Sequence, residues 1–172
     1  MGVRRATPQD ARSIAEVHVR SWQAAYQGLI PQEYLDALDP ARQLEARAKR
    51  IRDMDWTKGG CLIAEHGNRV IGFVHYGPTR DNDDGREPIG EVAAIYLASE
   101  SWGKGFGREL MNAALAHLAG AGYAQVTLWV LDTNSRAQSF YEKAGFTADG
   151  AVKLDDRGSF QLREVRYRRS LP

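Results

Sequence analysis

The sequence predicts a protein of the α/β (α+β) class, with the element order β-α-α-β-β-β-α-β-α-β-β. Three observations lead to this prediction. The chain has 172 residues, a length that suits one domain with a sizeable core. Strand-like and helix-like segments alternate along it without repeats, linkers or low-complexity stretches. Hydrophobic residues make up 43% and charged residues 26%, as in ordinary globular proteins.

The beginning of the chain predicts one strand followed by a helix. Residues 2–7 alternate in character, which indicates a short strand. Thr7 is a natural N-cap, and Pro8 suits the first helical position. Apolar residues at helical spacing then predict a helix over residues 11–26.

Two further helices are expected before the main run of strands. Residues 31–38 predict a short helix after a break in the apolar pattern. Residues 39–54 predict a longer one, with Asp39 as its N-cap and Pro40 at its first position. Because charged residues occupy most faces of this second helix, we expect it at the surface.

The middle of the chain predicts three strands. Residues 59–66 and 69–78 flank a Gly-Asn dipeptide, which favours a tight hairpin turn. A polar, acidic loop over residues 79–90 follows. The apolar, β-rich run over residues 91–98 predicts the third strand and leads into a glycine-rich turn.

The last part of the chain alternates between helices and strands. Glycines end both predicted helices, and the two final strands surround a short polar turn. The expected elements are a helix at 107–122, a strand at 124–131, a helix at 134–145, and strands at 146–154 and 159–171.

Charge, cysteine content and the N-terminal residues narrow the function classes. The net charge is +1 and no segment is strongly basic, which argues against a nucleic-acid partner. Cys61 is the single cysteine, so no intrachain disulfide can form, and its strand context predicts a small buried residue. No apolar targeting segment is visible, and no apolar run approaches the ~20 residues that span a bilayer. We therefore expect a cytoplasmic protein without membrane association.

The turn Gly103-Lys104-Gly105-Phe106-Gly107 lies between a strand and the start of a helix. The first amides of a helix have no intrahelical partner and carry partial positive charge. Glycine also allows the backbone to approach a phosphate closely. The pattern therefore predicts a diphosphate-binding turn, to which Lys104 and the following Arg108 add charge.

Two other nucleotide-binding motifs compete with this interpretation. A P-loop is excluded because the pattern G-x-x-x-x-G-K-S/T is absent. A dinucleotide-binding turn requires G-x-G-x-x-G, and the glycines here are one residue too close. Asp132 imitates the acid that binds a ribose, but only 40 residues follow it, too few to complete a doubly wound sheet.

Two segments resemble motifs of the Gcn5-related N-acetyltransferase (GNAT) superfamily. The segment EVAAIYLASESWGKGFGRELMNAAL resembles its Q/R-x-x-G-x-G/A signature, with Trp102 as a departure at the Q/R position. The segment NSRAQSFYEKAGF is similar to the N-x-x-A-x-x-x-Y-x-x-x-G-F helix of the family. The N-terminal half is similar to bacterial members of uncharacterised substrate. The resemblance implies one GNAT domain over residues 1–172, with a mixed sheet of about seven strands and helices on both faces.

The resemblance also implies an activity, the transfer of an acetyl group from acetyl-CoA to an amine by direct attack in a ternary complex. Acetyl-CoA would be the co-substrate, and no metal is expected. The acceptor would be a primary amine of a small molecule, a peptide or a protein N-terminus. Arg136 and Lys143 are candidates for the adenosine phosphates. The residues expected to bind the cofactor are Ile95, Tyr96, Leu97, Trp102, Gly103, Lys104, Gly105, Phe106, Gly107, Arg108 and Asn134.

Glu91 is the residue that the resemblance places in the role of general base. It begins the strand that leads into the glycine-rich turn, where the family's glutamate base lies when one exists. We expect it to remove a proton from the acceptor ammonium through a water molecule. The weaker rivals for this role are His75 and the acidic loop residues Asp81, Asp83 and Asp84.

Tyr141 matches the tyrosine that faces the CoA sulfur in the family. A phenol with a reference pKa near ~10 can donate a proton to the leaving thiolate. Asn134 matches the residue that hydrogen-bonds the pantetheine arm, and it also suits a helix N-cap. Trp22 and Tyr26 lie where acceptor specificity resides in the family, and they serve either as an aromatic wall or as core.

The departure at Trp102 supports an alternative, a non-catalytic acyl-CoA-binding sensor or interaction module of the same fold. Glu91, Asn134 and Tyr141 are all present, which favours catalysis. Dimers are frequent in the family, and the apolar C-terminal strands offer a surface for a homodimer. The sequence leaves the acceptor and the oligomeric state open.

Overall fold

The computed structural model describes residues 2–82 and 87–172, which form seven strands, five α-helices and two 3-10 helices. The strands are β1 (Gly2–Arg5), β2 (Gly60–His66), β3 (Arg69–Pro78), β4 (Ile89–Leu97), β5 (Gln125–Leu131), β6 (Thr147–Asp156) and β7 (Gln161–Ser170). The helices are η1 (Pro8–Asp10), α1 (Ala11–Ala25), α2 (Gln32–Asp36), α3 (Leu44–Arg52), η2 (Ser99–Ser101), α4 (Phe106–Gly120) and α5 (Ser135–Lys143).

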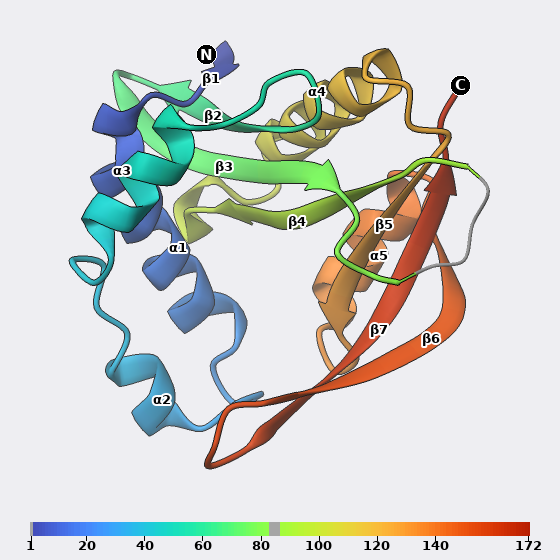
Figure 1. The fold of residues 1–172 in the computed structure, drawn as a ribbon. Coiled ribbons are helices and arrows are strands. Elements are labelled where there is room, and N and C mark those ends of the chain that lie inside the picture. The colour runs from blue at the N-terminus through green and yellow to red at the C-terminus, as the bar shows by residue number, and fades with distance from the viewer. Residues whose placement is uncertain (1, 83–86) are drawn as a thin grey trace.

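All seven strands join one sheet in the order β1-β2-β3-β4-β5-β7-β6 (Figure 1). Neighbouring strands are antiparallel except for β4 and β5, which are parallel. The crossover between that parallel pair contains the glycine-rich turn and α4. The prediction of one mixed seven-stranded sheet is confirmed.

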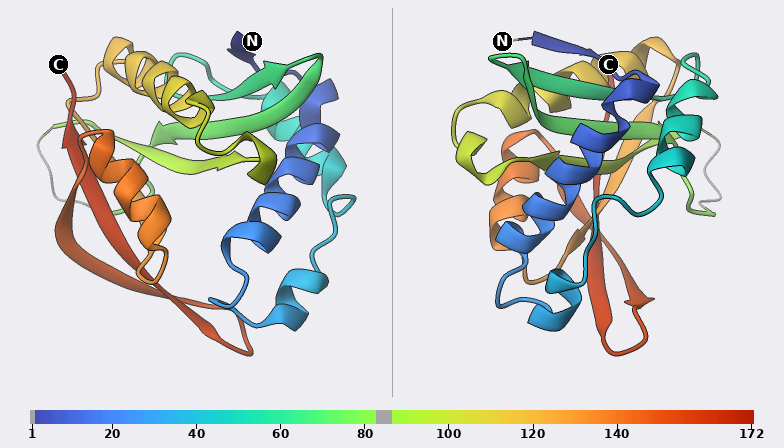
Figure 2. Two further views of the ribbon diagram at one scale, coloured as in Figure 1. Left: turned by 180° about the vertical axis from the view of Figure 1, so that it is seen from behind. Right: turned by 90° about the vertical axis from the view of Figure 1, so that its left-hand side faces the viewer.

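Helices cover both faces of the sheet, as predicted. On one face, α4 buries Leu110, Met111 and Leu118 in a cluster that also includes residues of β2 to β5 and α5. The left view of Figure 2, from behind, shows α4 and α5 in front of the sheet. On the other face, α1 packs Ile14 and Val17 against β2 and β3.

The hairpin of β6 and β7 reaches across to α2 (Figure 1). Arg157, in the hairpin turn, donates a hydrogen bond to the hydroxyl oxygen of Tyr34 at 3.2 Å. The ring of Phe160 packs edge-on against that of Tyr34, with centroids 5.0 Å apart. This contact joins the N-terminal helices to the C-terminal strands and closes one end of the space between them.

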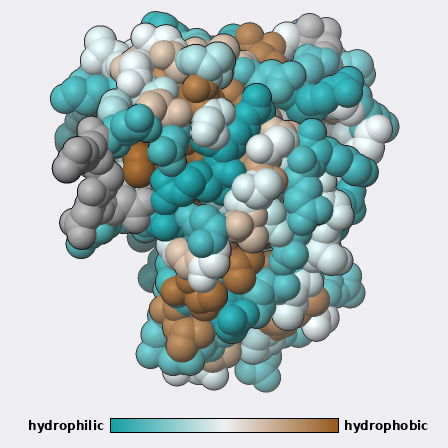
Figure 3. Space-filling view, turned by 90° about the vertical axis from the view of Figure 1, so that its right-hand side faces the viewer, coloured by the Kyte–Doolittle hydropathy of each residue, from teal (hydrophilic) through white to brown (hydrophobic). Residues whose placement is uncertain are grey.

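Strand β6 forms one edge of the sheet and carries exposed apolar side chains. Val152 is 46% exposed and Leu154 is 62% exposed. Figure 3, which looks from the side of β6 and β7, shows a largely hydrophilic surface on which some apolar side chains gather. No helix in the described part of the chain is both long and apolar enough to cross a bilayer.

Local sequence signals produce the turns that the sequence predicts. Gly67 and Asn68 both have positive φ, 56° and 58°, as a two-residue hairpin turn between β2 and β3 requires. The side chain of Asn134 accepts a hydrogen bond from the amide of Ala137 at 3.1 Å and so caps α5. Gly145, with φ of 84°, follows the end of that helix.

The predicted start of the third helix at Asp39 and Pro40 is wrong. Helix α3 begins at Leu44, because Gln43 adopts a left-handed conformation with φ of 62° that interrupts the helical backbone. Asp39 instead accepts a hydrogen bond from the amide of Ala41 at 2.8 Å in the preceding turn. The loop before α3 is therefore longer than the sequence suggests.

Candidate functional site

The parallel strands β4 and β5 separate and leave an opening in the middle of the sheet. They pair only over residues 89–91 and 125–127, so the rest of β4 has no strand partner on that side. Figure 1 shows the two strands diverging. A cavity of about 1290 Å³ occupies the opening, lined by residues of α1, β4, α4, β5, α5, β6 and β7. Nothing in the sequence pattern predicts how wide this opening is.

A β-bulge in β4 lies beside the opening. In the pairing with β3, His75 faces Ala94 but Tyr76 faces Val92, so Ala93 is an extra residue. A bulge leaves the extra residue out of the ladder and bends its strand. Ala93 and the following residues of β4 line the cavity with backbone groups that β5 does not occupy. Ile95, Tyr96 and Leu97 are all among them.

The glycine-rich turn forms one mouth of the cavity. Gly103 and Gly105 have φ of 74° and 88°, and Gly105 is the N-cap of α4. A Cβ atom built on either glycine meets nothing within 4 Å, so their backbone is open to a ligand. Gly107 is closer to its neighbours, because a Cβ there would lie 3.3 Å from the ring of Phe140. The turn thus leaves open space at Gly103 and Gly105, directly before the first amides of α4.

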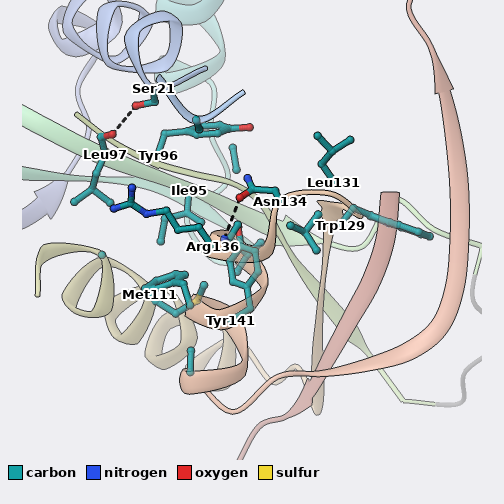
Figure 4. A pocket seen from close by; sticks show the side chains of 18 of the residues that line it. Ser21, Ile95, Tyr96, Leu97, Met111, Trp129, Leu131, Asn134, Arg136 and Tyr141 are labelled. Carbon is teal, nitrogen blue, oxygen red and sulfur yellow. Dashed lines mark hydrogen bonds between the residues drawn. The ribbon is translucent and has the colours of Figure 1, made fainter. Parts of the chain in front are cut away.

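Trp102, which replaces the Gln or Arg of the signature, makes two specific contacts beside the cavity. Its indole N–H donates to the carbonyl oxygen of Leu97 at 3.0 Å, and Ser21 donates to the same oxygen at 2.7 Å. The guanidinium of Arg136 lies over the indole ring, 3.7 Å from its centroid. Figure 4 shows Arg136, Ser21 and Leu97 together at the cavity. Trp102 therefore fixes the end of β4 and holds a cation beside the glycine-rich turn.

Tyr141 projects from α5 into the cavity (Figure 4). Its side chain is 9% exposed and packs edge-on against Phe140 and Phe146. Burial raises the pKa of its phenol above the ordinary value, and nearby Tyr96 adds to this effect. The hydroxyl therefore keeps its proton at neutral pH.

Glu91 lies at the opposite side of the cavity, where β4 and β5 still pair. Its carboxylate accepts hydrogen bonds from the backbone N (2.9 Å), Nε (3.1 Å) and Nη2 (2.5 Å) of Arg80. Burial raises the pKa of Glu91, but the bonds from Arg80 outweigh burial, so the pKa lies below its ordinary value. Glu91 is therefore an ionised and fully buried carboxylate in the resting protein.

Aromatic side chains form the wall between α1 and β4. The rings of Trp22 and Tyr26 meet edge-on with centroids 4.8 Å apart, and Trp22 lies 6.5 Å from Tyr96. All three residues line the cavity, while Trp22 and Tyr26 also pack beside the apolar cluster of Leu35 and Leu131. They are thus both core and cavity wall.

The cavity brings together most of the residues that the sequence singled out. Lys104, Arg108, Asn134, Arg136 and Lys143 are in its lining. The side chain of Phe106 is not, because it packs against the core and the ring of His66. His75 is also absent from the lining.

Asp81 and Cys61 are not in the lining of this cavity. Asp81 accepts hydrogen bonds from the indole N–H of Trp129, at 3.0 Å to its nearer oxygen, and forms an ion pair with Arg166. Asp83 and Asp84 lie outside the described residues. Cys61 is buried on the other face of the sheet, and burial raises the pKa of its thiol to about 12.

Sequence reasoning missed three features of the site. The pairing of Arg80 with Glu91 joins a loop residue to a strand, and no local pattern marks it. Lys153 and Glu164, which form an ion pair at 3.3 Å, reach the cavity only because β6 and β7 return to β5. The bulge at Ala93 carries no sequence signal that could have revealed it.

Comparisons with known proteins agree with this geometry. Residues 18–146 match the model of the acetyltransferase (GNAT) family. An uncharacterized N-acetyltransferase of Bacillus subtilis is 34% identical over 132 residues, which cover 77% of this chain and 72% of that protein. A probable N-acetyltransferase of Mycobacterium tuberculosis is 30% identical over 151 residues, which cover 86% of this chain and 80% of that protein.

A solved structure shares the same architecture. The PaiA N-acetyltransferase of Thermoplasma acidophilum, in complex with coenzyme A, superposes with a TM-score of 0.74 and covers 98% of both chains. It is 22% identical in sequence, so the likeness concerns the fold. Together with the match over most of the chain, these findings show that the protein belongs to the acetyltransferase (GNAT) family.

Proposed function

We propose that this protein transfers an acetyl group from acetyl-CoA to a primary amine of a small molecule or a protein N-terminus, by direct attack in a ternary complex. The observation that carries the proposal is the continuous cavity between β4 and β5. It runs from the glycine-rich turn past Tyr141 to Glu91. Its volume of about 1290 Å³ exceeds that of ordinary single-ligand pockets, about 300–1000 Å³, and so suits two substrates at once.

The residues at the mouth of the cavity fit coenzyme A. Gly103 and Gly105 leave space for a pyrophosphate to approach the first amides of α4. Lys104, Arg108 and Arg136 supply positive charge at the same mouth. The backbone of β4 beyond Glu91 offers groups without a strand partner to the pantetheine arm. Asn134 uses its side-chain oxygen as a helix cap, which leaves its amide nitrogen for that arm.

Acetyl-CoA supplies the acetyl group as an activated thioester, and the protein supplies the remaining chemistry. Free amides of β4 near the bulge at Ala93 are positioned to donate to a carbonyl oxygen as it gains negative charge. Tyr141, which keeps its proton at neutral pH, can donate to a leaving thiolate. No acetyl-enzyme step is needed, since the only cysteine is a buried neutral thiol outside the cavity lining.

Glu91 is the proposed proton acceptor for the incoming ammonium, acting through a water molecule. It is ionised and lies on the cavity side opposite the glycine-rich turn. The three hydrogen bonds from Arg80 lower its basicity, so a change in that pairing when the acceptor binds would strengthen the base. Because the pairing with Arg80 weakens Glu91 as a base, it also favours the alternative, an acyl-CoA-binding module without turnover.

Calorimetric titration with acetyl-CoA, followed by mass spectrometry of the intact protein, tests the proposal. We expect binding with one site per chain and no covalent acetyl group on the protein when the amine is omitted. Absence of acetyl-CoA binding would overturn the proposal. A stable acetyl-protein would contradict direct transfer while leaving acetyl-CoA as the donor.

A further inference from the structure

A second cavity of about 300 Å³ lies between α1, α3 and the loop that connects α2 to α3. It adjoins the first cavity, because Trp22 and Arg157 line both. Nothing in the proposed acetyl transfer uses it. Its lining consists of Ala15, His18, Val19, Trp22, Tyr34, Ala37, Leu38, Asp39, Pro40, Arg42, Gln43, Arg47 and Arg157.

The charged residues of this lining are three arginines and one aspartate. Arg42, Arg47 and Arg157 contribute the positive charges, and Asp39 contributes the negative charge. Arg157 already has an ion pair with Asp155 at 2.6 Å. Asp39 uses one oxygen on the amide of Ala41 in its own turn. Positive charge therefore exceeds negative charge around this cavity.

Arg47 is the residue whose charge is least compensated. Among the described residues, no carboxylate lies within 4.0 Å of its guanidinium, and its Nε–H is buried without a hydrogen-bond partner. The guanidinium has one polar contact with the described residues, from Nη2 at 3.5 Å to Nδ1 of His18. Burial lowers the pKa of Arg47, and Arg50 adds to this effect. Arg47 is half-buried, and a buried N–H of a charged group is costly unless an acceptor pairs with it.

The neighbours of Arg47 supply no countercharge. Burial, followed by the charge of Arg47, lowers the pKa of His18 to about 4, so that imidazole is neutral. Cys61 is likewise a neutral thiol, since burial raises its pKa to about 12. The buried Nε–H of Arg47 is therefore a donor that requires an acceptor atom.

We propose that the second cavity binds a small carboxylate, with the fork of Arg47 as its main ligand. A planar carboxylate matches the paired N–H groups of a guanidinium, and the cavity holds a group of this size with several carbons. Two sources can supply this chemistry, either a carboxylate carried by the acceptor amine or a free carboxylate anion. The first source rests on the proposed acetyl transfer, since Trp22 separates this cavity from the one that holds Tyr141.

The binding test uses acetate as the probe and needs no enzymatic activity. Thermal unfolding of the full chain is followed while sodium acetate replaces sodium chloride at constant ionic strength. We expect the Tm to rise by roughly 5–10 °C as acetate approaches one hundred times its Kd. The rise should be lost in Arg47→Met and reduced in Arg47→Lys, which keeps the charge but not the fork. Arg50→Met is the matched control on the same helix and should respond as the original chain does.

Stability without acetate separates a binding role from a structural one. Because Arg47 has no ion pair to lose among the described residues and only a long contact to His18, Arg47→Met should leave the Tm in chloride unchanged or raise it. A fall of several degrees, or an equal acetate response in Arg47→Met, would overturn the proposal. If Arg47→Met does not fold, Arg47→Lys decides the question, and an acetate response equal to that of the original chain would overturn the proposal.

A second arm identifies the source of the carboxylate. Acetyl transfer is compared between straight-chain ω-amino acids, from glycine to 6-aminohexanoate, and the n-alkylamines of matching length. A preference of tenfold or more in kcat/KM for one amino acid, lost in Arg47→Met and kept in Arg50→Met, supports the acceptor as the source. An Arg47-dependent acetate response without any such preference supports a free anion. Failure of acetyl transfer in every case would sink the proposed function but leave the acetate result intact.

Discussion

Glu91 and Arg80 form a bidentate pair in which, among the described residues, every hydrogen bond to the carboxylate comes from Arg80. The carboxylate is 2% exposed, whereas the side chain of Arg80 is 68% exposed. The arginine can therefore move into solvent while the glutamate stays in place. Because of this difference in exposure, movement of Arg80 would change the basicity of Glu91.

The first prediction concerns the pH dependence of turnover in Arg80→Met. Loss of the charged partner leaves burial as the main influence on Glu91, so its pKa should rise. The acidic limb of kcat/KM against pH should move upward by the same amount, because Glu91 must be ionised to accept a proton. Arg12→Met, which removes an exposed arginine of α1, is the control. An unshifted acidic limb would remove Glu91 as the base.

The second prediction concerns Tyr141→Phe. If the phenol donates its proton to the leaving thiolate, kcat should fall by about a hundredfold or more while the KM for acetyl-CoA stays within a fewfold. Tyr123→Phe removes a hydroxyl whose partner, the carbonyl of Lys58, lies outside the cavity, and it should leave kcat unchanged. Steady-state kinetics of the two variants provides the comparison. Equal kcat values in both would show that Tyr141 is only a packing residue.

The third prediction separates backbone strain from ligand contact at the glycine-rich turn. Gly105 and Gly150 both have φ of 88°, and a Cβ on either meets nothing within 4 Å. Alanine should cost about 1–2 kcal/mol of stability at each position, because both backbones are left-handed. Only Gly105→Ala should raise the KM for acetyl-CoA, by about tenfold, since Gly150 lies outside the cavity. Equal KM values for the two variants would place the pyrophosphate elsewhere.

The fourth prediction concerns the stack of Arg136 on Trp102. Arg136→Met should raise the KM for acetyl-CoA by about two- to tenfold through loss of a positioned cation. Trp102→Leu should do the same, and the double variant should be little worse than either single one. Arg5→Met breaks a similar stack on Trp56 away from the cavity and serves as the control. Fully additive effects would mean that the two residues act separately.

The fifth prediction concerns stability at acid pH. Burial, followed by the charge of Arg47, lowers the pKa of His18 from 6.5 to about 4 in the folded chain. The unfolded chain therefore binds more protons between these values, so the free energy of unfolding falls as the pH drops from 6.5 to 4. The loss amounts to about 3 kcal/mol relative to His18→Phe, which cannot titrate. Urea unfolding at several pH values measures this difference. Parallel pH profiles for the two proteins would show that His18 titrates normally.

Local signals in the sequence predict much of the fold and one mouth of the site. Gly67-Asn68 specifies its hairpin, Asn134 caps α5, and the glycines of 103–107 open the N-terminus of α4. In each case neighbouring residues alone determine the backbone. The wrong start at Asp39 shows the limit of such signals, because Gln43 interrupts the helix with a conformation that propensity does not favour.

The rest of the site depends on contacts between distant segments. Arg47 meets His18 across 29 residues, and Arg157 meets Tyr34 across 123. The separation of β4 from β5 begins beyond residues 89–91, next to the bulge at Ala93, and the far wall of the cavity includes residues of β6 and β7. Such features arise from packing rather than from the order of neighbouring residues. Sequence patterns therefore predicted candidate residues of the site but not the contacts between distant segments that shape the cavity.

Amine-dependent release of the CoA thiol tests the central claim most directly. The purified chain is supplied with acetyl-CoA and a broad panel of primary amines, including amino acids and N-terminal peptides, and each product is identified by mass. We expect sustained release over many turnovers with at least one amine, accompanied by its acetylated product. Tight binding of acetyl-CoA without release for any amine would contradict the account and identify the protein as a non-catalytic binding module.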